Sequence, residues 1–152
     1  MTTETIYNYH KINEQLITAG QPTADQLRAA AAEGFTTVIN LAVYDQTRTL
    51  FDEAHLVQSL GLRYYHIPVE WHNPTPADFA QFAQILDQLA PADKTLIHCA
   101  ANFRVTAFYS LYAMKQLGWS ETQAEQFRAI IWHGSNYPIW ENFMATIMAE
   151  MA

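Results

Sequence analysis

Residues 95–106 read Thr-Leu-Ile-His-Cys-Ala-Ala-Asn-Phe-Arg-Val-Thr, and this stretch decides the fold. Its first residues form a short apolar run that is typical of a buried strand. Residues 105–117 are apolar nearly all round, which predicts a helix at the centre of the molecule. A loop between such a strand and such a helix turns backbone N–H groups inward and adds the positive end of the helix dipole. The stretch therefore predicts an anion site at the mouth of a helix.

Two side chains of this stretch suit a bound oxyanion. Cys99 ends the strand, and the amides that hold an oxyanion also stabilise a thiolate, so we expect Cys99 to be nucleophilic at neutral pH. Arg104 offers a planar fork of donors that fits two phosphoryl oxygens. Each residue alone has a plainer interpretation, because a lone cysteine is often a small buried hydrophobe and an arginine at a helix start is often solvated. Their combination with a loop of small residues favours the anion site.

Strand patterns alternate with helix patterns along the chain. Short β-branched or aromatic runs occur at 37–41, 63–67 and 95–98. They predict an α/β fold with a central, mostly parallel sheet of four to five strands flanked by helices. Helices are expected at about 75–90, 105–117, 121–132 and 138–150, so the C-terminal third is all helical. Capping boxes mark three helix starts, at Thr23 with Gln26, Thr75 with Asp78, and Ser120 with Gln123.

Composition excludes several classes of partner. The 152 residues, half of them hydrophobic, match one globular domain spanning 1–152. A net charge of −7 with eight Lys and Arg leaves no basic patch, so we expect neither nucleic acid nor an anionic membrane as a partner. No stretch is long and apolar enough for a membrane span, and residues 1–15 lack the features of a secretory signal, so we expect a cytoplasmic protein. The single cysteine allows no internal disulfide.

The motif resembles the signature of cysteine-dependent protein tyrosine and dual-specificity phosphatases. It consists of the His98-Cys99 pair, then Arg104, then the hydroxyl of Thr106. Residues 19–23, 34–41 and 61–69 are similar to a bacterial branch of that superfamily, and the whole resemblance covers about residues 10–117. It implies a dual-specificity phosphatase-like fold with the phosphate loop at the carboxyl end of the middle strand, and a reaction without metal or organic cofactor. It also implies that phosphate binds to Ala100, Ala101, Asn102, Phe103 and Arg104, with His98 and Thr106 in support.

The motif departs from the superfamily pattern at three points. Four residues separate Cys99 from Arg104, where the superfamily usually has five, and rhodaneses share the shorter spacing. Asn102 stands where a glycine is common, and because asparagine tolerates positive φ we expect the loop to curl all the same. Trp71 stands where the general-acid Asp of related phosphatases is expected.

Nearby acids offer alternatives for the proton donor that such a reaction requires. Glu70 lies next to Trp71, and Asp78 is the next acid, although it has a structural use as part of a capping box. His72 is a further titratable side chain of the same segment. We therefore keep Glu70 and Asp78 as catalytic candidates.

The leading hypothesis is hydrolysis of a phosphomonoester, of phosphotyrosine type or a small aryl phosphate, through a phosphocysteine on Cys99. The substrate would be a phosphorylated small molecule or a phosphoprotein. A rhodanese-like sulfurtransferase and a non-catalytic phosphate-binding module remain alternatives. The aromatic residues of the helical tail are expected to pack over the sheet. They are Trp119, Trp132, Tyr137 and Trp140. The alternative is that this face forms the interface of a homo-oligomer.

Overall fold

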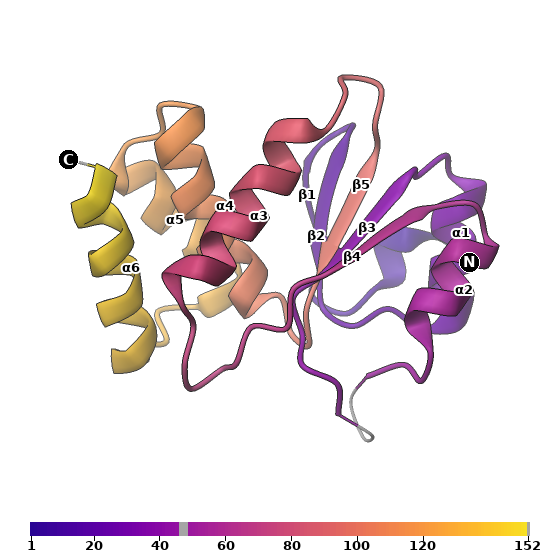
Figure 1. Cartoon of the computed structure of the whole chain (residues 1–152), viewed down its shortest axis with the longest axis horizontal. Coiled ribbons are helices and arrows are strands. Elements are labelled where there is room, and N and C mark those ends of the chain that lie inside the picture. The colour runs from indigo at the N-terminus through magenta and orange to yellow at the C-terminus, as the bar shows by residue number, and fades with distance from the viewer. Residues whose placement is uncertain (46–48, 152) are drawn as a thin grey trace.

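The computed structural model describes residues 1–45 and 49–151, and in this part of the chain a five-stranded sheet lies between two layers of helices (Figure 1). The spatial order of the strands is β1-β2-β5-β3-β4. Their bounds are β1 (His10–Asn13), β2 (Leu16–Ala19), β3 (Thr37–Asn40), β4 (Arg63–His66) and β5 (Thr95–His98). Only the β1–β2 pair is antiparallel among these strands. The predicted mostly parallel sheet is thus confirmed, with β5 at its centre.

The sequence patterns do not predict β1 and β2. Both are four residues long, and β1 lies at the sheet edge with residues that are alternately half-buried and exposed. β2 forms a strand because it pairs with β5 in parallel, with Leu16 opposite Thr95 and Ala19 opposite His98. Such pairing is a tertiary effect that local propensity does not reveal.

Helices connect the strands and form the whole last third of the described chain, as predicted. Their bounds are α1 (Ala24–Ala32), α2 (Glu53–Ser59), α3 (Pro76–Gln88), α4 (Phe103–Gln116), α5 (Glu121–Trp132) and α6 (Pro138–Met151). The capping boxes at Thr23, Thr75 and Ser120 all form, because each hydroxyl accepts from the third helical amide and the side chain there reaches back. Within residues 1–45 and 49–151, no helix combines the length and apolar character needed to cross a bilayer.

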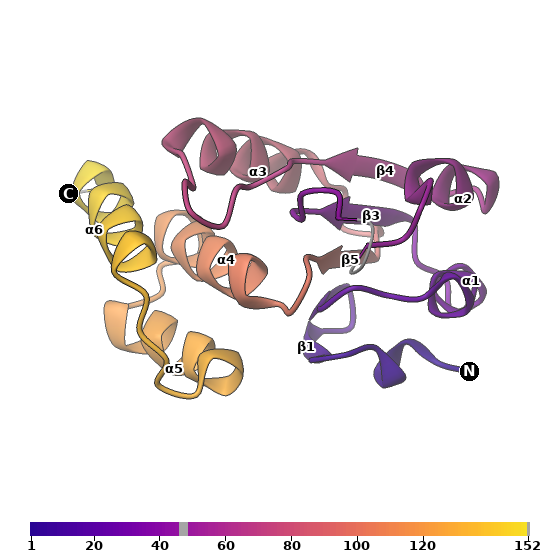
Figure 2. The same ribbon diagram turned by 90° about the horizontal axis from the view of Figure 1, so that it is seen from below.

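Each face of the sheet has its own apolar core. α1 and α2 cover one face, α3 and α4 cover the other, and α5 and α6 pack outside α4 (Figures 1 and 2). Neighbouring strand residues point to opposite cores: Val38 packs with α1 and α2, whereas Ile39 packs with α3 and α4. Residues 105–113 of α4 are all buried, which confirms the predicted central helix.

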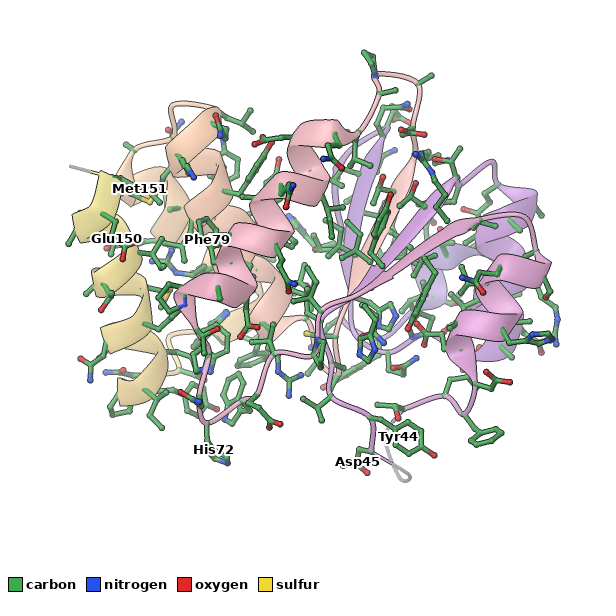
Figure 3. The ribbon with its side chains drawn as sticks, in the orientation of Figure 1. Tyr44, Asp45, His72, Phe79, Glu150 and Met151 are labelled. Carbon is green, nitrogen blue, oxygen red and sulfur yellow. The ribbon has the colours of Figure 1, made fainter. Side chains whose placement is uncertain are left out.

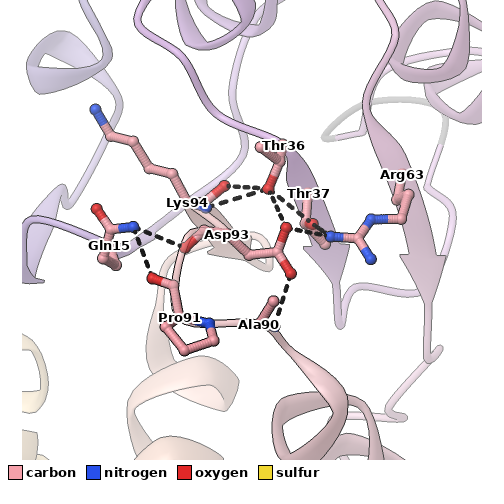
Figure 4. A network of polar contacts seen from close by, with 8 residues as sticks. All are labelled: Gln15, Thr36, Thr37, Arg63, Ala90, Pro91, Asp93 and Lys94. Carbon is pink, nitrogen blue, oxygen red and sulfur yellow. Dashed lines mark hydrogen bonds and ion pairs between the residues drawn. The ribbon is translucent and has the colours of Figure 1, made fainter.

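A polar network ties together the amino ends of the parallel strands (Figure 4). The Asp93 carboxylate accepts hydrogen bonds from the Arg63 guanidinium, the Thr36 hydroxyl and the Ala90 N–H. Arg63 begins β4, Thr36 precedes β3, and Asp93 precedes β5. This network secures one end of the sheet, and the loop of residues 99–104 lies at the opposite, carboxyl end.

Candidate active site

The loop between β5 and α4 curls so that its carbonyl groups are bound to the protein behind it. The Gln21 N–H donates to the Ala100 carbonyl at 3.0 Å, and Asn8 Nδ2 donates to the Ala101 carbonyl at 2.9 Å. Within residues 1–45 and 49–151, the N–H groups of Ala100, Phe103 and Arg104 donate to no acceptor, while Ala101 pairs with Gly20 in an isolated antiparallel bridge. Unpaired amides at the start of a helix are the donors that an oxyanion requires.

Two residues make this curl feasible. Asn102 adopts the left-handed conformation with φ of +69°, as the sequence predicts, and its Nδ2 donates to the Asn8 carbonyl and the Thr18 hydroxyl at 2.9 and 3.0 Å. Gly20 lies directly against the loop, since a Cβ placed there would be 2.7 Å from the Ala100 carbonyl oxygen. A side chain at residue 20 would therefore push the loop away from its observed position.

Cys99 and Arg104 meet in one cavity of about 390 Å³. Cys99 is 1% exposed, and the Nε–H of Arg104 is buried without an acceptor in the described part of the chain. A buried donor without a partner costs free energy, which a bound oxyanion would recover. Nε and the neighbouring Nη of a guanidinium form a planar fork that fits two oxygens of one phosphoryl group.

Aromatic side chains wall this cavity. Trp71, Phe103 and Tyr137 line it together with His72, Ala100 and Ala101. The Trp71 and Tyr137 rings are 5.1 Å apart at their centroids and meet edge to face. Trp140 Nε1 donates to the Trp71 carbonyl at 2.8 Å, which anchors this segment to α6. The wall is therefore a packed part of the fold.

The tail aromatics divide between packing and lining the cavity. Trp132 and Trp140 are buried and pack in the core, as expected. Tyr137, in contrast, is 38% exposed and lines the cavity. Sequence reasoning missed this, because the irregular spacing of the tail aromatics contains no signal that separates Tyr137 from its buried neighbours.

The structure does not bring the two candidate acids to the cavity. Glu70 is exposed, and its carbonyl accepts from the Asn73 N–H at 3.0 Å. The Asp78 carboxylate accepts from the Thr75 N–H at 3.1 Å and completes the capping box of α3. Among the titratable side chains of this segment, His72 lines the cavity, and it lies at the outer edge of the molecule in Figure 3.

The Thr106 hydroxyl is engaged within α4. It donates to the Asn102 carbonyl at 2.8 Å and accepts from Trp132 Nε1 at 3.0 Å. These bonds fix the first turn of α4 against α5, so the position of the loop depends on Thr106 through the backbone of Asn102.

His98 lies beneath the loop in a buried polar network. Its Nε2 is 2.6 Å from Glu53 Oε2, and Glu53 Oε1 accepts from Gln21 Nε2 at 2.7 Å. Burial raises the pKa of Glu53, but His98, the hydrogen bond from Gln21 and the nearby Tyr64 outweigh it, so that this pKa lies below its ordinary value. Sequence reasoning missed Glu53, because an acid at a helix start far from the motif has no local pattern to single it out.

Metal ligands are not grouped in the described residues: no cluster of three or more His, Cys, Asp or Glu side chains could hold an ion there. The residues that line the cavity supply a thiol, a guanidinium, an imidazole, backbone amides and aromatic rings. This set can bind an oxyanion and attack it with sulfur.

Comparison with known proteins places the chain in a family. No protein-family model matches the chain, and no curated protein does either. Among solved structures, a DUF442 protein of Shewanella putrefaciens CN-32 that is assigned as a phosphatase shares 30% sequence identity, with a TM-score of 0.87 over 97% of this chain and 92% of that one. PTPMT1 shares 22% identity, with a TM-score of 0.77 over 94% and 95% of the two chains. TpbA of P. aeruginosa shares 15%, with a TM-score of 0.70 over 95% and 90%. The chain therefore belongs to the DUF442 family of phosphatases, and it shares its fold with PTPMT1 and TpbA.

Proposed function

We propose that the chain hydrolyses phosphomonoesters through a phosphocysteine intermediate on Cys99. The observation that carries this proposal is the meeting, in one cavity, of the Cys99 thiol, the unpaired Arg104 Nε–H and the unpaired loop amides. The amides and the guanidinium bind the non-bridging oxygens and stabilise the charge of the transition state. The thiolate attacks phosphorus, the S–P bond forms as the bond to the ester oxygen breaks, and the alcohol leaves. Water then cleaves the S–P bond, which releases inorganic phosphate and restores the thiolate.

Aryl phosphates are the proposed substrate class. The flat walls formed by Trp71, Phe103 and Tyr137 suit an aromatic ring, which packs edge to face or offset against such neighbours. Phenols also leave more readily than alkyl alcohols, so they depend less on a general acid. This matters because Glu70 and Asp78 lie outside the cavity in this conformation. Both TpbA with phosphotyrosine and PTPMT1 with PI(5)P are structures of related folds with a phosphorylated molecule, which supports a phosphorylated substrate.

Steady-state hydrolysis of p-nitrophenyl phosphate tests the proposal. We expect multiple turnovers by the wild-type protein and none above background for Cys99→Ser, because a serine hydroxyl in this site is a far weaker nucleophile than a thiolate. Thiosulfate-to-cyanide transfer measured on the same sample separates the rhodanese-like alternative. Phosphate binding without turnover would identify a non-catalytic module, and hydrolysis that persists in Cys99→Ser would contradict the mechanism.

A further inference from the structure

His98 lies between two groups that can only accept hydrogen bonds in their usual states. Its Nε2 is 2.6 Å from Glu53 Oε2, and its Nδ1 is 3.3 Å from the carbonyl oxygen of Cys99. The His98 side chain is completely buried, and the Glu53 side chain is 5% exposed. A carboxylate and a carbonyl both accept hydrogen bonds, so each ring nitrogen of His98 faces an acceptor. This pair lies one residue from the nucleophile.

Neighbouring side chains hold Glu53 in its ionised form. Gln21 Nε2 donates to Glu53 Oε1 at 2.7 Å, and the nearby Tyr64 side chain also lowers the pKa of this carboxyl. Asn40 Nδ2 donates to the Tyr64 hydroxyl at 3.0 Å and holds that side chain in place. Burial and the nearby carboxylate raise the pKa of Tyr64, so it remains a neutral donor. These contacts oppose protonation of Glu53 across the range in which the enzyme would work.

Other titratable groups border this network on its outer side. Asp52, Tyr44 and His66 line a cavity of about 180 Å³ that also reaches Glu53 and Tyr64. His66 Nε2 is 2.6 Å from the Ala42 carbonyl, so it is directed to the backbone.

Gln21 connects Glu53 to the phosphate loop as well. While its side chain donates to Glu53, its backbone N–H donates to the Ala100 carbonyl at 3.0 Å. Glu53 is therefore linked to both parts of the site: through His98 to the strand end that carries Cys99, and through Gln21 to the loop that would hold phosphate.

We propose that Glu53 is a positioning residue for the phosphatase reaction, which keeps His98 doubly protonated and oriented so that the positive end of the pair faces Cys99 and favours its thiolate. This inference rests on the proposed role of Cys99 as nucleophile. Glu53 does not contact substrate; it acts through His98 and Gln21.

The Glu53→Gln variant tests the proposal, because glutamine keeps the shape but removes the charge that holds the second proton on His98. The direct measurement is the rate of Cys99 alkylation by iodoacetamide as a function of pH, and it reports on one thiol because Cys99 is the only cysteine of the sequence. We expect the pH at half-maximal rate to move upward. We also expect kcat/KM for p-nitrophenyl phosphate near neutral pH to fall about 10- to 100-fold, the range for a lost hydrogen bond to a charged group, with KM nearly unchanged.

Matched variants separate positioning from a general loss of structure. Glu125→Gln, at an exposed glutamate of α5, should leave both measurements unchanged. Glu53→Asp keeps the charge and should recover part of the lost kcat/KM. The proposal would be overturned if the Glu53→Gln protein is folded by circular dichroism and its Cys99 is alkylated with the same pH dependence as in the wild type.

A second variant applies if Glu53→Gln does not fold. Tyr64→Phe removes a hydroxyl that lowers the pKa of the same carboxyl, so we expect a smaller upward move of the alkylation midpoint. An unmoved midpoint in Tyr64→Phe would likewise overturn the role of Glu53. Because alkylation requires no turnover, a shift seen in a protein without phosphatase activity would contradict the proposed function and leave the effect of Glu53 on the thiol standing.

Discussion

The guanidinium carbon of Arg104 lies 5.8 Å from the centre of the Trp71 ring, so the proposed phosphate-binding cation packs over an aromatic face. Trp71 is in turn fixed by Tyr137 and Trp140. We conclude that the ring holds Arg104 ready for an anion, since a cation over a desolvated indole gains roughly 0.5–2 kcal/mol.

Replacing Trp71 should weaken phosphate binding. We expect Trp71→Ala to raise the inhibition constant of inorganic phosphate roughly 3- to 30-fold, the equivalent of that stabilisation, and Trp71→Phe to have a smaller effect because a ring remains. The inhibition constant of phosphate for each variant is measured from its competitive inhibition of p-nitrophenyl phosphate hydrolysis. Equal inhibition constants in wild type and Trp71→Ala would show that the ring does not support Arg104.

Gly20→Ala should disrupt the loop without unfolding the protein. The added Cβ would be 2.7 Å from the Ala100 carbonyl oxygen and 2.9 Å from the Tyr7 carbonyl oxygen, so the loop must shift. We expect a loss of kcat/KM of about 100-fold, as for misplaced catalytic groups. Gly118→Ala is the control, since that glycine has positive φ, which an alanine strains, but no atoms within 4 Å of its Cβ. Gly118→Ala should lower the unfolding temperature and leave kcat/KM unchanged, and the same kinetic loss in both variants would refute the steric explanation.

Hydrolysis should depend steeply on the leaving group. Because neither Glu70 nor Asp78 lines the cavity, we expect no carboxylic acid to protonate the departing oxygen, and kcat/KM should fall strongly as the leaving-group pKa rises. A series of substituted phenyl phosphates measures this slope. Glu70→Gln should leave the slope unchanged, whereas a steeper slope in that variant would identify Glu70 as the proton donor after a loop movement.

Asp78→Ala should act on stability more than on activity. Its carboxylate caps α3 by accepting from the Thr75 N–H, and loss of a capping interaction typically costs about 0.5–2 kcal/mol. Thermal unfolding beside steady-state kinetics separates the two effects. A large fall in kcat without a change in unfolding temperature would assign Asp78 to the chemistry.

The Asp93 network should make stability depend on acid pH. The hydrogen bond from Arg63, then those from the Ala90 N–H and the Thr36 hydroxyl, hold the pKa of Asp93 below its ordinary value of 3.8. A depressed folded-state pKa means that the stabilisation is present above the ordinary value and is lost as pH falls through the folded-state pKa. We therefore expect the difference in unfolding temperature between wild type and Asp93→Asn to shrink as pH is lowered from 6 to below 3.8. A difference that stays constant over this range would contradict the contribution of the charge.

Much of this architecture follows from local sequence signals. The capping boxes at Thr23, Thr75 and Ser120 and the β-branched runs predict helix starts and three strands, because both signals act within a few residues. The curl at Asn102 is predicted for the same reason, from the backbone preference of one residue type.

The remaining parts depend on contacts between residues far apart in the chain. β2 exists through its pairing with β5, and Glu53 meets His98 across 45 positions. Tyr137 reaches the cavity because α6 packs beside the Trp71 segment. No pattern along the sequence encodes such meetings, so the network beneath Cys99 and the aromatic wall become visible only in the folded chain.

The central claim is that the Cys99 sulfur forms a covalent bond to phosphorus during turnover. Rapid acid quenching of the enzyme during p-nitrophenyl phosphate hydrolysis, followed by mass spectrometry of its peptides, tests this directly. We predict a phosphoryl adduct on the peptide that contains Cys99, and none when Cys99 is replaced by serine. Full turnover with no adduct on that peptide, or with an adduct on another residue, would contradict the account.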